Sequence, residues 1–226
     1  MGIGIQKLKN GLLSLFLKSN CPICTRPTEL DFCEYCQRQL LRSQLTNPAK
    51  FWQGELPVFV WGAYEGILKQ AIAVLKYESQ PQLARPLGHW LGQAWLKSPA
   101  ATCTKKLTVV PIPLHPTKLQ QRGFNQAELI ARSFCQCTGY KEQPLGLERV
   151  RETKAQFGLS RQEREQNLSD AFVVGKSLLK HPSALSVLLV DDIYTTGTTV
   201  RSAAQILHRQ GIEVYGLVAI ATSKRD

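Results

Sequence analysis

The stretch "VLLVDDIYTTGTTV", residues 187–200, decides how the rest of the chain is interpreted. Four apolar residues open it, as in a strand buried inside a sheet. Asp191 and Asp192 follow directly, at the point where such a strand would leave the sheet. The pattern predicts a strand with an acidic exit, followed by a turn that opens a helix. In this turn Gly197 lies among four threonines, Thr195, Thr196, Thr198 and Thr199.

The turn after the acids has the features of a site for a phosphorylated sugar. The free backbone N–H groups at the start of a helix bind anions, and Gly197 lets the backbone approach a ligand closely. Threonine hydroxyls add donors to phosphate oxygens. Asp191 and Asp192 would repel a phosphate placed on them, but they suit ribose hydroxyls or a Mg²⁺ that the ligand carries. The simpler alternative is a capped helix start beside two surface acids, which needs far fewer of these residues.

The residues around this stretch alternate between strand and helix patterns. Runs of β-branched and aromatic residues indicate strands, and apolar residues three and four apart indicate helices. This alternation predicts an α/β fold with a parallel sheet flanked by helices, in which ligands bind beyond the carboxyl ends of the strands. The expected strands are 56–64, 107–114, 170–174, 186–192 and 212–222, and the expected helices are 66–77, 82–96, 125–137 and 198–211.

A separate module is expected before the alternating pattern begins. Four cysteines there form two C-x₂-C pairs separated by eight residues: Cys21, Cys24, Cys33 and Cys36. Four thiolates suit tetrahedral Zn²⁺ and leave no open position for chemistry, so the predicted role of the metal is structural. An iron–sulfur cluster would use the same ligands, and two disulfides are a third possibility. We therefore expect a zinc module over residues 1–46 and a second domain over residues 56–226.

Three blocks of the sequence together resemble a known family. The strand and turn at 187–200 look like the signature of type I phosphoribosyltransferases, which bind phosphoribosyl pyrophosphate (PRPP). The blocks "VVPIPLHPTKLQQRGFNQAELIA" (109–131) and "RVRETKAQFGLSRQEREQNLSDAFVV" (149–174), behind a four-cysteine module, are similar to the ComF family. The resemblance implies a type I phosphoribosyltransferase-like sheet that binds PRPP with Mg²⁺. It also implies a part in natural competence, the uptake of single-stranded DNA.

The resemblance also implies roles for individual residues. Lys118, Arg122 and Gly123 fall in a second anion-binding loop, which would hold the pyrophosphate. Arg151 and Lys154 fall in a mobile loop that would close over PRPP, exclude water and stabilise the leaving group. A basic surface for nucleic-acid phosphates is an equal alternative for that stretch. The implied catalytic residues are Asp191, Asp192, Arg151 and Lys154, and the 5′-phosphate would bind Thr195, Thr196, Gly197, Thr198 and Thr199.

The composition narrows the possible partners without deciding between two functions. The chain of 226 residues carries a net charge of +11, which predicts phosphate groups, nucleic acid or an acidic protein surface as partners. One function is an enzyme or enzyme-like binder of PRPP. The other is a non-catalytic competence factor that binds single-stranded DNA or a helicase-like protein. The sequence contains no run of eighteen apolar residues, so we expect no membrane span. Its seven cysteines, without a secretion signal, predict a location in the cytoplasm.

Overall fold

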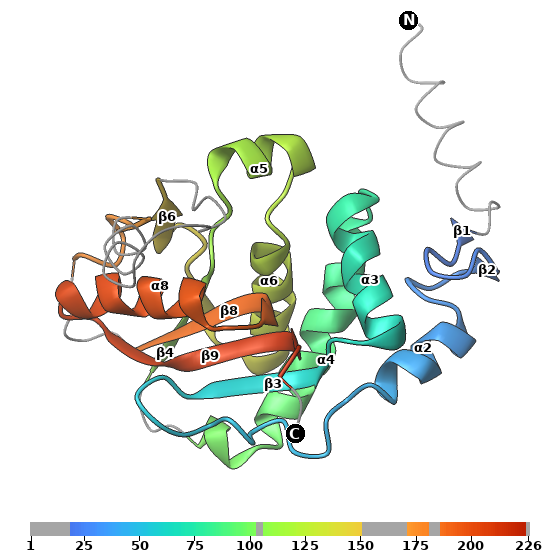
Figure 1. Cartoon of the computed structure of the whole chain (residues 1–226), viewed down its shortest axis with the longest axis horizontal. Coiled ribbons are helices and arrows are strands. Elements are labelled where there is room, and N and C mark those ends of the chain that lie inside the picture. Colours follow the sequence, from blue (N-terminus) through green and yellow to red (C-terminus); the bar gives the residue numbers. More distant parts are fainter. Residues whose placement is uncertain (1–18, 103–105, 151–170, 181–185, 225–226) are drawn as a thin grey trace, which may run out of the picture.

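The structure is a computed structural model, and it describes residues 19–102, 106–150, 171–180 and 186–224. Its centre is a five-stranded sheet in the order β3-β9-β8-β4-β5, in which all neighbouring pairs are parallel. Figure 1 shows β8 between β9 and β4. This arrangement confirms the expected parallel sheet flanked by helices. The strands are β3 (Val58–Ala63), β4 (Leu107–Pro111), β5 (Lys141–Glu142), β8 (Ser186–Tyr194) and β9 (Glu213–Thr222).

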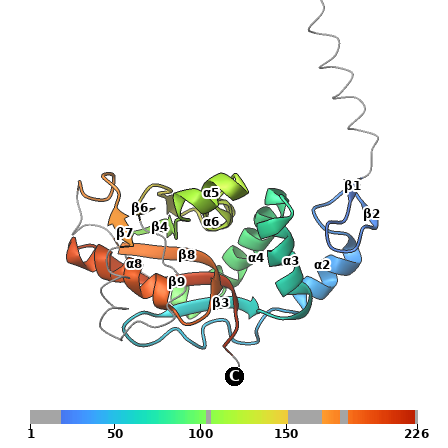
Figure 2. The ribbon, with the colours of Figure 1, turned by 45° about the horizontal axis from the view of Figure 1, so that its top comes forward.

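Helices cover both faces of the sheet, which explains why the central strands are apolar without alternation. Leu188 and Val190 of β8 pack into the cluster beneath α3, α4 and α6. Val187 and Leu189 pack on the opposite face. Helix α8 and the antiparallel β6–β7 pair lie on that side of the sheet (Figure 2). The elements are α3 (Gly66–Tyr77), η1 (Pro81–Leu83), α4 (Ala84–Leu96), η2 (Pro99–Ala101), α6 (Gln126–Thr138), β6 (Leu147–Arg149), β7 (Phe172–Val174) and α8 (Thr198–Arg209).

Two local expectations about the ligand-binding edge were wrong. The segment after β4, expected to be a loop, contains the short helix α5 (Pro116–Arg122). Pro116 has the fixed φ that suits the first position of a helix, and Gly123 ends the helix in a left-handed conformation at φ 81°. Strand β8 also continues past residue 192 to Tyr194, because its partner β9 runs alongside up to the Tyr194–Thr222 pair. The two acids therefore lie inside the strand.

The four-cysteine module packs directly on the helical layer of the sheet. It consists of β1 (Ser19–Asn20), β2 (Pro27–Thr28) and α2 (Glu34–Leu41). Phe32 of the module stacks on Trp90 of α4 with ring centroids 6.0 Å apart, and both belong to one core. The Gln70 side chain of α3 donates a hydrogen bond to the Ile23 carbonyl over 3.3 Å. The boundary between residues 1–46 and 56–226 remains a prediction. Within the described ranges, no helix is long and apolar enough to cross a membrane.

Candidate functional site

The threonine-rich turn forms a narrow cradle at the carboxyl end of the central strand. Its hydroxyls face one another: the Oγ1 atoms of Thr196 and Thr198 lie 2.8 Å apart. The Arg201 guanidinium, one turn into α8, donates to the Thr196 carbonyl over 2.8 Å and fixes the turn. The cradle has a volume of about 40 Å³, and Asp191 lies in its wall. Backbone N–H groups at the start of α8 and hydroxyl donors therefore meet in one small concave site.

Gly197 is required at this turn for two reasons. Its φ of 76° is in the left-handed region, which is strained for residues with a side chain. An added Cβ would lie 2.7 Å from Arg201 Nη1 and 2.8 Å from Tyr194 Cε2. The ring of Tyr194 lies directly beneath the turn.

Asp191 is the acid that faces the cradle. Its Oδ1 accepts a hydrogen bond from the Asp192 backbone N–H over 2.8 Å. Burial of the carboxyl group and the adjacent Asp192 carboxylate raise the pKa of Asp191 well above its usual value, and Lys76 only partly opposes this shift. A ligand that brings a cation or hydroxyl donors would stabilise the charged form of a carboxylate in these surroundings.

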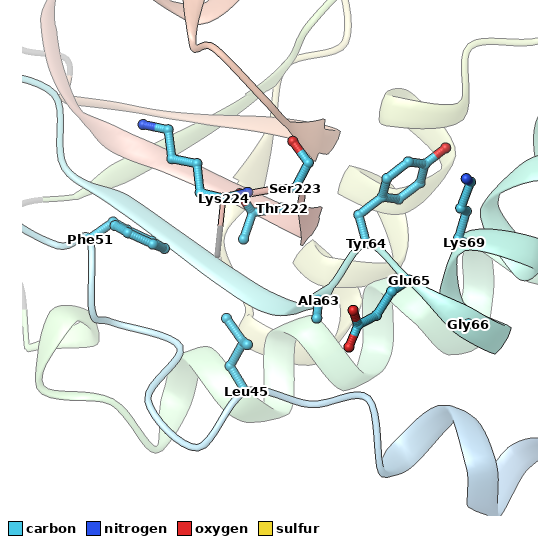
Figure 3. A pocket seen from close by; sticks show the side chains of 10 residues that line it. All are labelled: Leu45, Phe51, Ala63, Tyr64, Glu65, Gly66, Lys69, Thr222, Ser223 and Lys224. Atoms are coloured by element: carbon cyan, nitrogen blue, oxygen red, sulfur yellow. The ribbon is translucent and has the colours of Figure 1, made fainter. Parts of the chain in front are cut away.

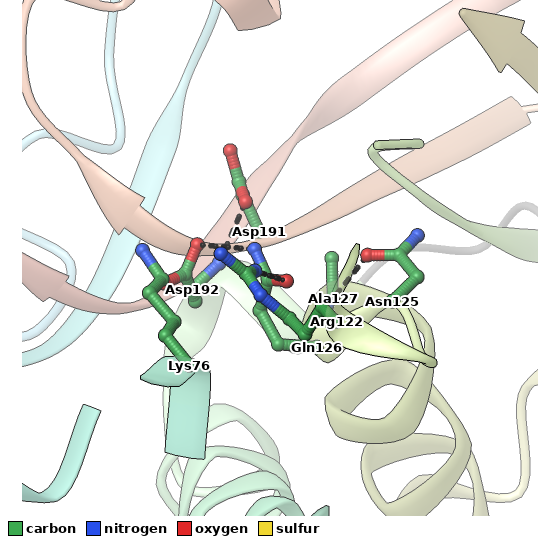
Figure 4. Close-up of polar contacts among 7 residues, drawn as sticks. All are labelled: Lys76, Arg122, Asn125, Gln126, Ala127, Asp191 and Asp192. Carbon is green, nitrogen blue, oxygen red and sulfur yellow. Dashed lines mark hydrogen bonds and ion pairs between the residues drawn. The ribbon is translucent and has the colours of Figure 1, made fainter. Parts of the chain in front are cut away.

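Asp192 points the other way, into the layer of α3 and α6. It is 4% exposed, and its Oδ2 forms an ion pair with Lys76 Nζ. Its Oδ1 accepts a hydrogen bond from Gln126 Nε2 over 3.3 Å. Figure 4 shows these groups gathered around Asp192 while Asp191 points away from them. The two adjacent acids therefore have different surroundings, which the sequence did not reveal.

The cations expected to hold pyrophosphate share a second cavity beside Asp192. Lys118 and Arg122 of α5 line it, together with Lys76 and Tyr77 of α3, and its volume is about 280 Å³. Arg122 lies over the Tyr77 ring, 5.6 Å from its centroid, and donates to Gln126 Oε1. Since Gln126 also donates to Asp192, a continuous chain of polar contacts joins this cavity to the central strand.

Sequence reasoning missed three residues of the site. Lys76 sits in the last turn of an ordinary amphipathic helix, so nothing in its pattern marked it. Gln126 was noted only as part of a helix start, and Arg201 only as part of a helix. Asn125 caps α6, and its Oδ1 accepts a hydrogen bond from the Ala127 N–H over 3.1 Å. Arg151 and Lys154, expected in the mobile loop, lie outside the described residues.

The four cysteines of the module converge on one point. The Sγ atoms of Cys21, Cys24, Cys33 and Cys36 all lie within 4.8 Å of one another. Tetrahedral zinc–sulfur bonds place sulfur atoms about 3.8 Å apart, so this spacing fits a metal ion. Burial alone would raise the pKa of the Cys21 thiol, but hydrogen bonds from backbone groups of Cys33, Ile23 and Cys24 lower it to about 7. The cluster could hold a metal.

A family comparison agrees with this geometry. The model of the phosphoribosyl transferase domain matches residues 119–226. The matched range contains Arg122, both acids and the whole threonine turn, and it begins just after Lys118. All residues that line the cradle lie in the matched range, and so do Gln121 and Arg122 of the second cavity.

Whole-chain relatives extend the likeness beyond that domain. Competence protein F of Haemophilus influenzae is 29% identical over 92% of this chain and 90% of its own length. Competence protein ComFC of Bacillus subtilis is 24% identical over 84% of this chain and 72% of its own. The chain is a homologue of competence proteins F and ComFC. The DNA utilization protein YhgH of Salmonella typhimurium is 31% identical to this ComF homologue over 66% of the chain, which spans 64% of that relative.

One solved structure also resembles this ComF homologue. It is described as the allosteric regulatory enzyme of purine biosynthesis, with a TM-score of 0.36 and 17% identity. The match covers 63% of this chain, which spans only 26% of that larger one.

Proposed function

We propose that this ComF homologue binds PRPP, or a related ribose 5-phosphate ligand, together with Mg²⁺, and that it serves DNA uptake. The observation that carries the proposal is the pairing of a threonine cradle with Asp191 in its wall. Phosphate donors and an acceptor for sugar hydroxyls thereby occur in one site. The matched phosphoribosyl transferase domain supports the same ligand class.

The two cavities divide the ligand between them. The 5′-phosphate would accept hydrogen bonds from the cradle residues, and Asp191 would accept from the ribose hydroxyls. The pyrophosphate would lie toward Lys118 and Arg122, whose positive charges stabilise it. Arg151 and Lys154 remain the residues proposed to cover the ligand. Asp192 is already held by Lys76 and Gln126, so we assign it a positioning role on the strand.

The side chains near the cradle fit a magnesium ion that arrives with the ligand. Mg²⁺ in proteins binds one or two carboxylates together with substrate phosphates and water. Asp191 supplies one such carboxylate, partly exposed and facing the cradle. When bound, the ion would neutralise charge on the pyrophosphate. Asp191 and the cradle donors would hold the ribose in place.

Zinc is the metal we propose for the four-cysteine cluster. Four thiolate ligands, with no histidine or carboxylate among them, leave no position for substrate, so this ion would stabilise the module only. The module has almost no core apart from what it shares with α3 and α4. Metal binding would therefore contribute much of its folding free energy.

The role in DNA uptake is supported by the printed names of the relatives. Two are competence proteins, and one is a DNA utilization protein. The chain's net charge of +11 favours anionic partners and so supports a second candidate function. In that function the protein binds single-stranded DNA or a competence helicase and does not turn over a substrate. Magnesium-dependent release of pyrophosphate with an added amine or base would favour the enzyme, and salt-dependent DNA binding without release would favour the second function.

Calorimetric titration of PRPP with Mg²⁺ tests the proposal. A hydrogen bond to a charged group contributes about 1.5–3 kcal/mol, so Asp191→Asn should weaken binding roughly ten- to a hundred-fold. Glu148→Gln, an exposed change on β6, is the matched control and should bind as the wild type does. Equal affinity of wild type and Asp191→Asn would refute the assignment of Asp191.

A further inference from the structure

Helix α5 carries two cations of the second cavity, yet packing does not fix their positions. None of the seven residues of this helix is buried. Figure 1 shows α5 standing above α6, beyond the end of the sheet. A long side chain on such a helix samples several rotamers, which costs free energy when a ligand orders it. Another contact is therefore needed if Arg122 is to meet a ligand in one orientation.

The segment that carries α5 is closed at its base by Asn125. The Nδ2 atom of this buried side chain donates to the Ile112 carbonyl, just beyond β4, over 3.1 Å. Its Oδ1 accepts from the Ala127 N–H at the start of α6. These two bonds fix the first turn of α6 against the central sheet, and Gln126 is the first residue of that helix.

The Gln126 amide joins Arg122 to Asp192 (Figure 4). Its Oε1 accepts a hydrogen bond from the Arg122 guanidinium, and its Nε2 donates to Asp192 Oδ1 over 3.3 Å. A guanidinium only donates and a carboxylate only accepts, so these two neighbours set the orientation of the amide. Asp192 is held in turn by its ion pair with Lys76. Gln126 is 5% exposed, so water competes little for these bonds.

Tyr77 contacts the same guanidinium more weakly. Arg122 Cζ lies 5.6 Å from the centroid of the Tyr77 ring, and Tyr77 is 76% exposed. Cation–π contacts at exposed positions contribute little, so the buried amide is the stronger constraint on Arg122. A guanidinium has several N–H donors, and its bond to Gln126 leaves others for phosphate oxygens in the second cavity.

We propose that Gln126 is a positioning residue, whose amide orients Arg122 toward a pyrophosphate group in the second cavity. An amide suits this role because it accepts from the guanidinium and donates to the carboxylate at the same time. Gln126 itself would not touch the ligand. The inference rests on the proposed function, since pyrophosphate is the ligand that Arg122 would bind.

A further cavity, of about 590 Å³, lies apart from these contacts at the carboxyl ends of β3 and β9. Figure 3 shows Phe51 and Lys224 on one side of it, and Tyr64 and Lys69 on the other. Among the described residues that line this cavity, none takes part in the contacts around Gln126. Variants of Gln126 leave its walls unchanged, so their effect on pyrophosphate binding is attributed to the second cavity.

Calorimetric titration of the full chain with pyrophosphate and Mg²⁺ tests the role. Gln126→Met keeps the length of the side chain and removes its hydrogen bonds. It should weaken pyrophosphate binding about two- to ten-fold, the cost of ordering one long side chain on binding. Arg122→Met should weaken it about ten- to a hundred-fold, as expected for loss of a charged hydrogen bond. Lys97→Met, which removes a positive charge at an exposed position after α4, should leave the affinity unchanged.

The double variant distinguishes positioning from a general structural effect. A residue that acts through Arg122 has nothing to orient once Arg122 is absent, so Gln126→Met should cause no further loss in the Arg122→Met background. Ribose 5-phosphate, which would bind in the cradle, should bind to Gln126→Met as it does to the wild type.

Three results would overturn the role of Gln126 and leave the proposed function standing. They are wild-type pyrophosphate affinity in Gln126→Met, the same loss in both backgrounds, or an equal loss for ribose 5-phosphate. Failure of the wild type to bind pyrophosphate would instead refute the assignment of the second cavity, and this inference with it.

Discussion

Lys76 of α3 forms an ion pair with Asp192 of β8, at the centre of the candidate site. The Lys76 side chain is 16% exposed and that of Asp192 is 5% exposed, so water screens the pair poorly. The pair ties the helical layer to the strand that carries the cradle. It also leaves Asp191 as the acid available to a ligand.

Removing the lysine should therefore destabilise the fold. Lys76→Met leaves Asp192 buried without its cation, which costs about 3 kcal/mol in comparable pairs. Urea denaturation should show this loss in the free energy of unfolding. Lys76→Met combined with Asp192→Asn removes both charges and should recover part of it, while Lys97→Met should change little. A single variant as stable as the wild type would contradict the importance of the pair.

Gly197→Ala should damage both stability and ligand binding. The left-handed φ alone costs roughly 1–2 kcal/mol for a residue with a Cβ. Gly139→Ala is a matched control, because Gly139 has φ 75° at the end of α6 but no atom within 4 Å of an added Cβ. Thermal denaturation should show a larger loss for Gly197→Ala, whose Cβ meets Tyr194 and Arg201. In calorimetry, only Gly197→Ala should weaken the binding of PRPP. Equal effects of the two variants on stability and binding would show that the close contacts are unimportant.

The purified protein should contain one zinc ion per chain, measurable by elemental mass spectrometry. Cys33→Ser should lose the ion, because it removes one of four ligands, whereas Cys137→Ser should retain it. Chelation should also change tryptophan fluorescence, since Phe32 of the module stacks on Trp90. Full zinc content in Cys33→Ser would show that the metal is bound elsewhere.

Glu142 should make stability depend on pH. Burial raises the pKa of this carboxyl group, Arg132 lowers it in part, and Glu128 raises it further. The folded state then holds its proton more tightly than the unfolded state, whose pKa is about 4.3. The free energy of unfolding should fall as pH rises from about 4 through the raised folded pKa, and then level off. Glu142→Gln should remove this slope in urea denaturation at several pH values, and Glu148→Gln should keep it. Parallel curves for wild type and Glu142→Gln would refute the assignment.

Local patterns predicted the framework of the fold well. The apolar run 187–190 indicated a strand covered on both faces, and the helix expected over 66–77 has those same bounds in the structure. These successes rest on periodicity, which depends on residues near in sequence. The strand order was not predicted, because pairing joins segments such as 58–63 and 213–222 that are distant in the chain.

The candidate site was predictable only in part, for the same reason. Gly197 and the four threonines around it are consecutive in the sequence, so the local pattern was enough to predict the cradle. The different surroundings of Asp191 and Asp192 depend on Lys76, which is more than a hundred residues away from them. Helix α5 was missed because its seven residues give too short a pattern to distinguish from a loop.

The packing of the cysteine module on α4 has a consequence for how the protein matures. Phe32 and Trp90 stack on each other and so bury part of each other's surface. Phe32 belongs to the cysteine module, which we propose is ordered by zinc. A newly made chain that lacks the ion would present bare aromatic surface to chaperones and proteases. The cellular zinc supply would then determine how much folded protein accumulates, but not the activity of each folded molecule.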